Sequence, residues 1–365
     1  MKTETVQIMA GAAVISAVTY VPILAREHLG ANEFFVTLLV GGYATATFVS
    51  SYLFGRAGDI HGRRFVLRIG LLLSALSFGL LLLSSSPEAL FVIRVTNGFC
   101  YGMYPGALAA YAHESDMLMG RFATFGALGW GAGMVLTGLA GSFNIYYAFG
   151  LSSLFYMVAF ATAMTLPPIE HIEMDVPLLP FNTLKKNFPV YLAVLIRHSS
   201  ASAVWTLWPL FLHDLGGDVF MIGIIQATNS VSQAIFMAAI TQRIGYEKLV
   251  MMGLLASAAA FAWFALVTDI LHMIPAQVML GFSWACLYVG ALRYVTDQTN
   301  EKSTASGLLQ SMMSISGVIG PVIATVLYLK WPSYTPIILN AMIMSLVAFV
   351  IFVYSARSRK SDVNH

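Results

Sequence analysis

The sequence predicts an all-α integral membrane protein whose twelve transmembrane helices form two six-helix, pseudo-symmetric halves. Three observations predict this class: the composition, the number of long apolar segments and the distribution of positive charge. The chain has 365 residues, of which 58% are hydrophobic and only 10% are charged, and its mean hydropathy is +0.77. A soluble domain carries roughly 25% charged residues. A water-soluble protein of this composition would expose aggregation-prone apolar surface.

Twelve apolar segments have about the length of 20 residues that a transmembrane helix needs. In chain order they are residues 5–25, 33–54, 66–86, 88–111, 122–142, 145–166, 189–212, 219–240, 249–268, 271–292, 304–328 and 334–355. The first contains Pro22, lacks a basic region beyond Lys2 and runs into a second span, so we predict a retained helix and not a signal peptide. The longest polar stretch, 167–188, predicts a cytoplasmic linker between an N-terminal bundle, 1–166, and a C-terminal bundle, 189–365.

Positive charge predicts the orientation. If both termini are cytoplasmic, the termini and even-numbered loops hold 15 Lys and Arg residues, and the odd-numbered loops hold two, Arg26 and Lys330. The positive-inside rule therefore predicts a multi-pass plasma-membrane protein with both termini in the cytoplasm.

The net charge of +2 does not suggest a nucleic-acid partner. Both cysteines, Cys100 and Cys286, fall in apolar runs, which argues against a disulfide framework.

The chain also resembles itself at an offset of about 183 residues. Asp59 and Gly62 correspond to Gln242 and Gly245 in this comparison. The pattern R-x3-G-F at 94–99 becomes Q-x3-G-F at 277–282, and LGANEFF at 29–35 resembles LGGDVFM at 215–221. Parallel repeats of this kind place the substrate near mid-membrane, between the two halves.

Three motifs then carry a family resemblance. GRAGDIHGRR resembles the loop motif that joins the second and third helices of the major facilitator superfamily, although Ala57 replaces a frequent Leu. RVTNGFCYG resembles the fourth-helix motif of the same family, and GALGWGAG in the fifth span is a loose match that lacks the usual Pro. The resemblance extends over essentially the whole chain. The matching residues are Gly55, Asp59, Gly62, Arg63 and Arg64 in the loop, and Arg94, Gly98 and Gly102 in the fourth span.

The resemblance implies that the loop motif gates the protein. Asp59 would meet the N-terminal end of the eleventh helix near Ser303 and Thr304, where a carboxylate satisfies free N–H groups and the helix dipole. Such a latch would hold the cytoplasmic side shut, and it would be one-sided because the second half has Gln242 at this position. The alternative is a solvated loop that only fixes topology.

The resemblance also implies that the first, fourth, seventh and tenth helices line a central cavity, and each carries polar or aromatic residues here. Hydrogen bonds between helices, each worth under about 1 kcal/mol, are the alternative explanation for any single polar residue. We expect Gly98, Gly102 and Gly106 to serve close helix packing. The candidate substrate-binding residues are Arg94, Asn97, Tyr101, Arg197, His198, Trp205, Trp208, Gln277, Trp284 and Tyr288.

Two arginines lie within spans, whereas every acidic residue lies in a loop, a tail or a helix end. Buried arginines are costly and usually functional, and the guanidinium fork matches carboxylates and phosphates. This pattern favours an anion site in which Arg197 is the main ligand, with His198 and Gln277 beside it. His198 is also the one group near mid-membrane that could titrate near neutral pH.

The sequence therefore predicts a transporter that moves a small solute by alternating access, and it favours an organic anion or a polar metabolite. One alternative is an exporter of hydrophobic compounds resembling drug antiporters. A second is a sensor or accessory protein that keeps the fold without transporting. We expect no enzyme activity, no metal and no cofactor, and a monomer in the bilayer. The coupling proton or ion, and the choice between uptake and export, stay open.

Overall fold

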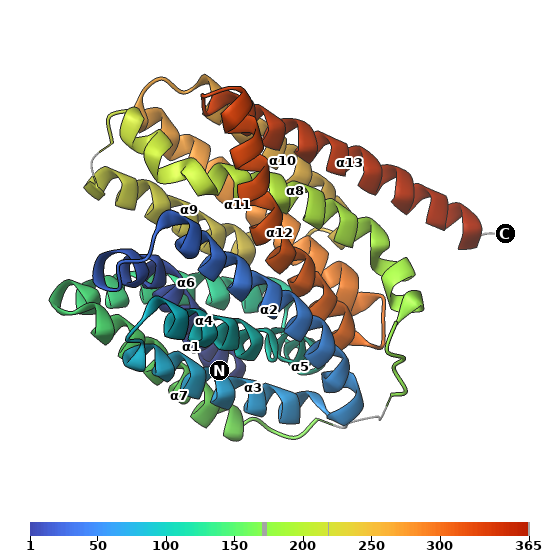
Figure 1. Cartoon of the computed structure of the whole chain (residues 1–365). Coiled ribbons are helices and arrows are strands. Elements are labelled where there is room, and N and C mark those ends of the chain that lie inside the picture. Colours follow the sequence, from blue (N-terminus) through green and yellow to red (C-terminus); the bar gives the residue numbers. More distant parts are fainter. Residues whose placement is uncertain (170–173, 218, 364–365) are drawn as a thin grey trace. The chain divides into compact units, whose positions relative to one another are not determined.

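The computed structural model describes residues 1–169, 174–217 and 219–363, and every regular element in these ranges is helical (Figure 1). The chain forms two compact units, Met1–Thr183 with Thr299–Ser314, and Leu184–Gln298 with Ile315–His365. Residues 299–314 thus pack with the first helices, although the sequence places them in the C-terminal bundle. The boundaries of the two predicted bundles stay a prediction, and residues 170–173 of the predicted linker lie outside the described residues.

The first unit contains seven α-helices among its described residues before the linker. Side chains cap three of them, because Asn32, Ser86 and Asn144 each accept a hydrogen bond from a backbone N–H group in the first turn. In this unit α1 packs on α6 and α7, and α2 packs on α4. The helices are α1 (Lys2–Ile23), α2 (Glu33–His61), α3 (Arg63–Gly79), α4 (Pro87–Gly102), α5 (Pro105–Glu114), α6 (Met119–Phe143) and α7 (Ile145–Met164).

The remaining helices belong wholly or mainly to the second unit. There α10 packs on α11 and α13, and the core gathers around Trp208, Phe261 and Phe264. The boundary between the units falls inside α12, between Ser314 and Ile315. The helices are α8 (Phe181–Asp214), α9 (Val219–Ala239), α10 (Tyr246–Leu266), α11 (Met273–Asp297), α12 (Lys302–Lys330) and α13 (Thr335–Val363).

The predicted twelve segments correspond to these thirteen helices, because α4 and α5 together make one interrupted segment. The sequence predicts an unbroken helix over 88–111, and this is wrong at Met103 and Tyr104. Pro105 has no N–H group and disfavours helical geometry in the residue before it.

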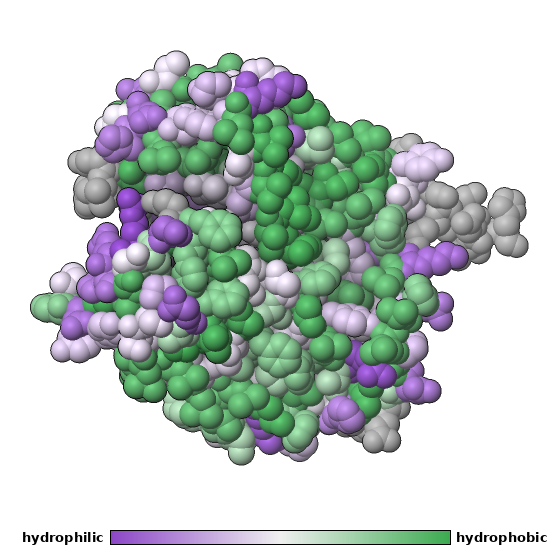
Figure 2. Space-filling view, viewed as in Figure 1, coloured by the Kyte–Doolittle hydropathy of each residue, from purple (hydrophilic) through white to green (hydrophobic). Residues whose placement is uncertain are grey.

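By length and composition alone, nine helices within the described residues could cross a membrane. Broad hydrophobic areas cover the helices on the face in Figure 2.

The motif between the second and third spans is mostly helical and not a loop. α2 continues through Asp59 to His61, and α3 begins at Arg63. Gly62 alone makes the turn, with φ of 96°, a conformation that L side chains rarely adopt. Asp59 is therefore held on the last turn of a rigid helix.

The two units repeat the same helix contacts, each within itself. Gly98 of α4 packs on the backbone of Tyr43 in α2, and Gly281 of α11 packs on the backbone of Asn229 in α9. In the same way Gly70 of α3 faces Tyr104, and Gly253 of α10 faces Leu287. Gly98 and Gly281, Gly70 and Gly253, and Tyr104 and Leu287 are each 183 residues apart, which supports the internal repeat that the sequence predicts.

Candidate functional site

Asp59 is fully buried in the first unit and meets the start of α12. Its carboxylate accepts hydrogen bonds from the Ser303 N–H at 3.1 Å, and from the Thr304 N–H and hydroxyl, both at 2.7 Å. These N–H groups have no partner inside their own helix, and the helix dipole favours a negative charge there. The contact that the sequence predicts between Asp59 and residues 303–304 is confirmed.

Arg63 neutralises this carboxylate from the next helix. Its guanidinium donates to Asp59 Oδ1 at 2.9 and 3.2 Å, to the Asn300 carbonyl at 3.2 Å, and pairs with Glu114 at the end of α5. The side chain is buried, so these bonds are shielded from water. One arginine thus links α2, α5 and the segment that precedes α12.

Glycines let α2 and α5 approach α12 closely. A Cβ added to Gly55 would lie 2.9 Å from the Ser303 carbonyl oxygen, and one added to Gly58 would overlap the Ser303 hydroxyl. A Cβ on Gly106 of α5 would lie 2.8 Å from the same carbonyl oxygen. Close packing is confirmed for the predicted small-residue run, since Gly98 and Gly102 press against the backbone of α2.

A second polar cluster lies on α4 in the first unit. The Arg94 guanidinium sits 3.7 Å above the Tyr43 ring, but its Nη1 has no hydrogen-bond partner among the described residues. The Asn97 amide is fully buried, and neither its oxygen nor its nitrogen has a partner in the described part of the chain. Buried polar groups are normally paired, so these atoms are available to a polar ligand or to water.

Tyrosines surround this cluster. Tyr101 stacks on Tyr43 with ring centroids 6.0 Å apart and meets Tyr104 edge-on at 5.8 Å, while the Tyr104 and Tyr156 hydroxyls lie 3.5 Å apart. Because Tyr104 sits where the helix is interrupted, the break between α4 and α5 sets the direction of its ring. Interrupted helices build many transporter sites, so we define Arg94, Asn97 and these four tyrosines as the arginine–tyrosine cluster.

Arg197 is satisfied by neutral partners in the second unit. Its Nε donates to the Ser257 hydroxyl at 2.8 Å, and Ser257 is 2.5 Å from the Ser283 hydroxyl. The guanidinium also lies 5.7 Å from the Phe261 ring and 5.4 Å from the Trp284 ring. These contacts tie α8 to α10 and α11, so Arg197 has a packing role whether or not it binds a ligand.

Next to Arg197, three rings form a stack on α8 and α11. His198 stacks on Trp284 at 5.1 Å, and Trp284 stacks on Tyr288 at 5.5 Å. All three side chains are half-buried, and His198 Nδ1 has no partner among the described residues. We call His198, Trp284 and Tyr288 the ring stack.

The other predicted residues of the second unit lie elsewhere. Trp208 belongs to the hydrophobic core, and Trp205 packs against that core. Gln277 lies beside α9, where its carbonyl accepts a hydrogen bond from Asn229 at 3.3 Å, and its own Oε1 has no partner in the described ranges. The structure therefore brings Arg197, His198, Trp284 and Tyr288 together, and it joins Gln277 to α9 instead of to Arg197.

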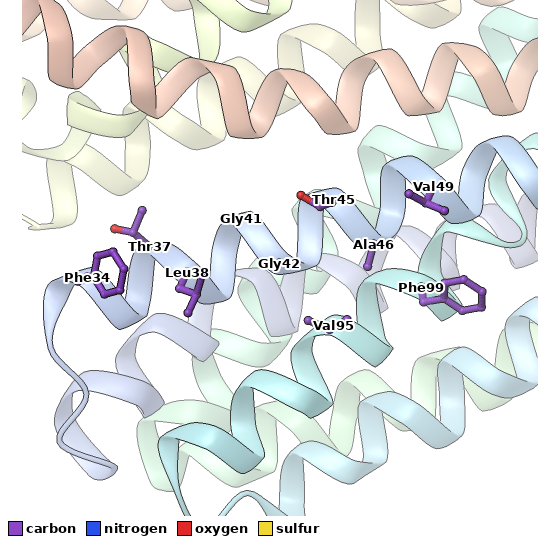
Figure 3. Close-up of a pocket in the computed structure, with 10 residues that line it drawn as sticks. All are labelled: Phe34, Thr37, Leu38, Gly41, Gly42, Thr45, Ala46, Val49, Val95 and Phe99. Atoms are coloured by element: carbon purple, nitrogen blue, oxygen red, sulfur yellow. The ribbon is translucent and has the colours of Figure 1, made fainter.

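The first unit also carries an apolar surface groove of about 640 Å³ between α2 and α4 (Figure 3). It contains none of the predicted site residues. Nor does the described part of the chain bring three or more His, Cys, Asp or Glu side chains together as a metal would need. The groove is lined by Phe34, Thr37, Leu38, Gly41, Gly42, Thr45, Ala46, Val49, Val95 and Phe99.

Sequence reasoning missed several partners of the site residues. Tyr43, Tyr156 and Glu114 lie outside every motif, so no sequence signal identified them. Ser257 had a signal, since GLLLSALSF at 70–78 matches GLLASAAAF at 253–261. This match aligns Ser257 with the buried Ser74 and Phe261 with Phe78.

Long apolar helices with buried polar clusters, arranged in two units that repeat their helix contacts, are typical of a multi-pass membrane protein. The sequence profile of the Major Facilitator Superfamily matches residues 5–180 and 190–364. The chain belongs to this family of transporters and is not an enzyme.

Relatives and solved structures agree with this assignment. The chain is 26% identical to the class B tetracycline resistance protein of Escherichia coli over 336 residues, covering 84% of this chain and 82% of the relative. It is also 26% identical to the class D protein of Salmonella ordonez, covering 83% and 82%. The fold matches the human organic anion transporter MFSD10 (TETRAN) with a TM-score of 0.80 at 16% identity, covering 96% and 98%. It matches the nucleoside transporter NupG with a TM-score of 0.68 at 17% identity, covering 97% and 98%.

Proposed function

We propose that this protein exports hydrophobic compounds, and that tetracycline is the first compound to test. The observation that carries this proposal is the relationship to tetracycline resistance proteins over 84% of the chain. It reverses the order that the sequence favours, in which an organic anion or polar metabolite comes first and the exporter second. The proposal keeps alternating access, with the Asp59 contact as the latch.

The ring stack is the substrate surface in this proposal. His198, Trp284 and Tyr288 offer a half-buried face of aligned rings beside the Arg197 cation. Such a face suits a flat, multi-ring compound, because offset ring pairs contribute about 0.5–1.5 kcal/mol beyond area burial.

Export is tested in proteoliposomes and in a susceptible strain. We expect tetracycline to be transported against its gradient, and Trp284→Ala to lower the rate roughly two- to tenfold, which corresponds to the loss of one ring contact. Trp263→Ala is the matched control, because Trp263 is an exposed tryptophan on α10 outside the ring stack. Equal rates in both variants would remove the ring stack from the proposal, and no transport by the unaltered protein would reject tetracycline.

An organic anion is the second candidate. It is supported by Arg94 Nη1 and the Asn97 amide, which are buried without partners among the described residues. A carboxylate or sulfonate would satisfy the guanidinium in two-point contact. We expect Arg94→Gln to abolish transport of such an anion and Arg94→Lys to weaken it. Arg197→Gln gives the corresponding test of the residue that the sequence ranks first, and inhibition of transport by cations but not by anions would rule this candidate out.

We further propose that the protein lies in the plasma membrane with both termini in the cytoplasm and that a proton drives transport. The positive-inside distribution supports the orientation. His198 supports the coupling, because it is a titratable group inside a span whose Nδ1 has no partner among the described residues. Collapse of an imposed pH gradient should stop accumulation, whereas collapse of a sodium gradient should leave it unchanged.

A further inference from the structure

The segment that leads into α8 carries large apolar side chains that the rest of the chain leaves uncovered. The exposed fractions are 63% for Leu178, 58% for Leu179, 68% for Phe181 and 53% for Phe188. All four lie in the stretch that the sequence predicts as the polar linker. From this clustering we propose that residues 178–188 form an interfacial anchor that binds the anionic lipid surface of the cytoplasmic leaflet.

Helix geometry places Phe181 and Phe188 on one face of α8. Phe181, Lys185 and Phe188 are spaced i, i+4 and i+7, so they project from the same side of α8. The opposite side is buried at Thr183 and Asn187. The Thr183 hydroxyl donates to Glu301 in the first unit, which fixes the rotation of the first turn of α8. The apolar face is therefore presented outward by the fold itself.

The preceding residues are fixed as well. Arg56 of α2 donates to the Val176 carbonyl at 2.8 Å and to the Pro177 carbonyl at 3.2 Å, and the Val176 side chain is fully buried. Leu178 and Leu179 follow directly and remain exposed. The apolar residues thus extend from a tethered backbone.

A lipid surface is the occupant that fits this chemistry. Lys185 and Lys186 are exposed among the apolar residues, and Asp175 is the one carboxylate between 174 and 188. Apolar residues with adjacent lysines are typical of segments that lie in the headgroup layer, and anionic lipids complement the charge. α8 continues into its hydrophobic span, and Phe181 lies only about 10 Å along the helix from Phe188. This length is comparable with the headgroup layer of a bilayer.

The anchor rests on the orientation proposed above but not on any substrate, so it can fail separately from the export proposal. The test uses the full-length protein in nanodiscs, with a polarity-sensitive fluorophore on a single introduced cysteine. Phe181→Cys samples the anchor, and Asn182→Cys, exposed on a different side of the same helix, is the matched control. Both native cysteines are buried, which limits background labelling.

Brominated lipids quench only probes that touch them. We expect strong quenching at position 181 and several-fold weaker quenching at 182. We also expect brominated phosphatidylglycerol to quench position 181 more than brominated phosphatidylcholine does. Lys185→Ala should reduce that preference about fivefold, the effect of one basic side chain near an anionic surface. Equal quenching by the two lipids would overturn the anionic preference. Quenching at 181 by aqueous iodide but by neither brominated lipid would show that the face is exposed to water, and it would overturn the anchor.

Discussion

At the scale of single residues, the carboxylate of Asp59 is tightly held in the first unit. It has no exposed surface and accepts five hydrogen bonds, two from Arg63, one from Ser303 and two from Thr304. The sequence suggests a polar loop in which a substitution would leave stability nearly unchanged. The structure corrects that expectation, because the residue lies on a helix and its charge is compensated only inside the protein.

Asp59→Asn should therefore lower both stability and transport. Hydrogen bonds to charged groups are worth about 1.5–3 kcal/mol, and we expect a loss of this size in the free energy of unfolding. Thermal unfolding in detergent measures it, and proteoliposome uptake measures the slowed cycle. Asp175→Asn is the control, because Asp175 is an exposed linker carboxylate. A variant at 59 with the melting temperature and rate of this control would show that the contact is not a latch.

The contact of Asp59 with Ser303 and Thr304 could be predicted from the family resemblance, whereas its bond to Arg63 and the partner of Arg94 could not. Arg94 packs on Tyr43, and that contact depends on how far α2 and α4 are rotated about their axes. Helix rotation is set by side-chain packing across the whole unit, which a single sequence does not reveal.

At the scale of helices, glycines decide how closely α2 approaches α12. Gly55 and Gly58 lie on one face of α2. On α12, Gly307 packs against this face, and a Cβ added to Gly307 would overlap the Ser51 carbonyl oxygen. The Asp59 hydrogen bonds depend on these contacts, because a wider spacing between α2 and α12 would move the carboxylate away from the Ser303 and Thr304 N–H groups.

Gly58→Ala should consequently act like a weakened latch. The added Cβ would overlap the Ser303 hydroxyl, and we expect a loss of transport together with increased labelling of a cysteine placed at Thr304. Gly41→Ala is the matched control, since nothing lies within 4 Å of a Cβ at that position of the same helix. The second substitution Ser303→Ala removes the overlapping hydroxyl and should restore part of the rate. Failure of this rescue would point to a cause other than the crossing of the two helices.

Pro105→Ala tests the break between α4 and α5. Alanine restores the N–H group that proline lacks, so the two helices can join. We expect unchanged or higher thermal stability and a several-fold lower transport rate, because Tyr101 and Tyr104 would turn away from Arg94. Wild-type transport with raised stability would show that the break does not position the site. The Tyr-Pro-Gly sequence at 104–106 signals this break, but hydropathy alone treats the segment as continuous.

At the scale of the whole molecule, the sequence predicts the class of protein well. Composition and apolar segments are enough for a multi-pass helical protein, and motif spacing is enough for the family. The site is predicted less completely. Arg197, His198, Trp284 and Tyr288 do come together, but Trp208 lies in the core and Gln277 belongs with α9. A hydrophobic span gives no amphipathic pattern strong enough to separate core-facing from cavity-facing aromatics.

Topology is tested by cysteine labelling in intact cells. With both termini cytoplasmic, an impermeant thiol reagent should label His28→Cys, in the first external loop, and leave Asp175→Cys unlabelled until the membrane is permeabilised. Both positions are exposed, so accessibility within the protein does not distinguish them. The reverse pattern would invert the orientation, together with the leaflet assigned to the anchor.

The burial of Asp59 has a consequence for biosynthesis. The Thr304 N–H and hydroxyl, which donate hydrogen bonds to Asp59, lie 245 residues later in the chain. At translation speeds of about 5–20 residues per second, they are synthesised roughly 12–50 s after the aspartate. During this interval Arg63, four residues further on, is the neighbour that can already neutralise the carboxylate. The first unit therefore cannot finish folding until residues 299–314 have been synthesised.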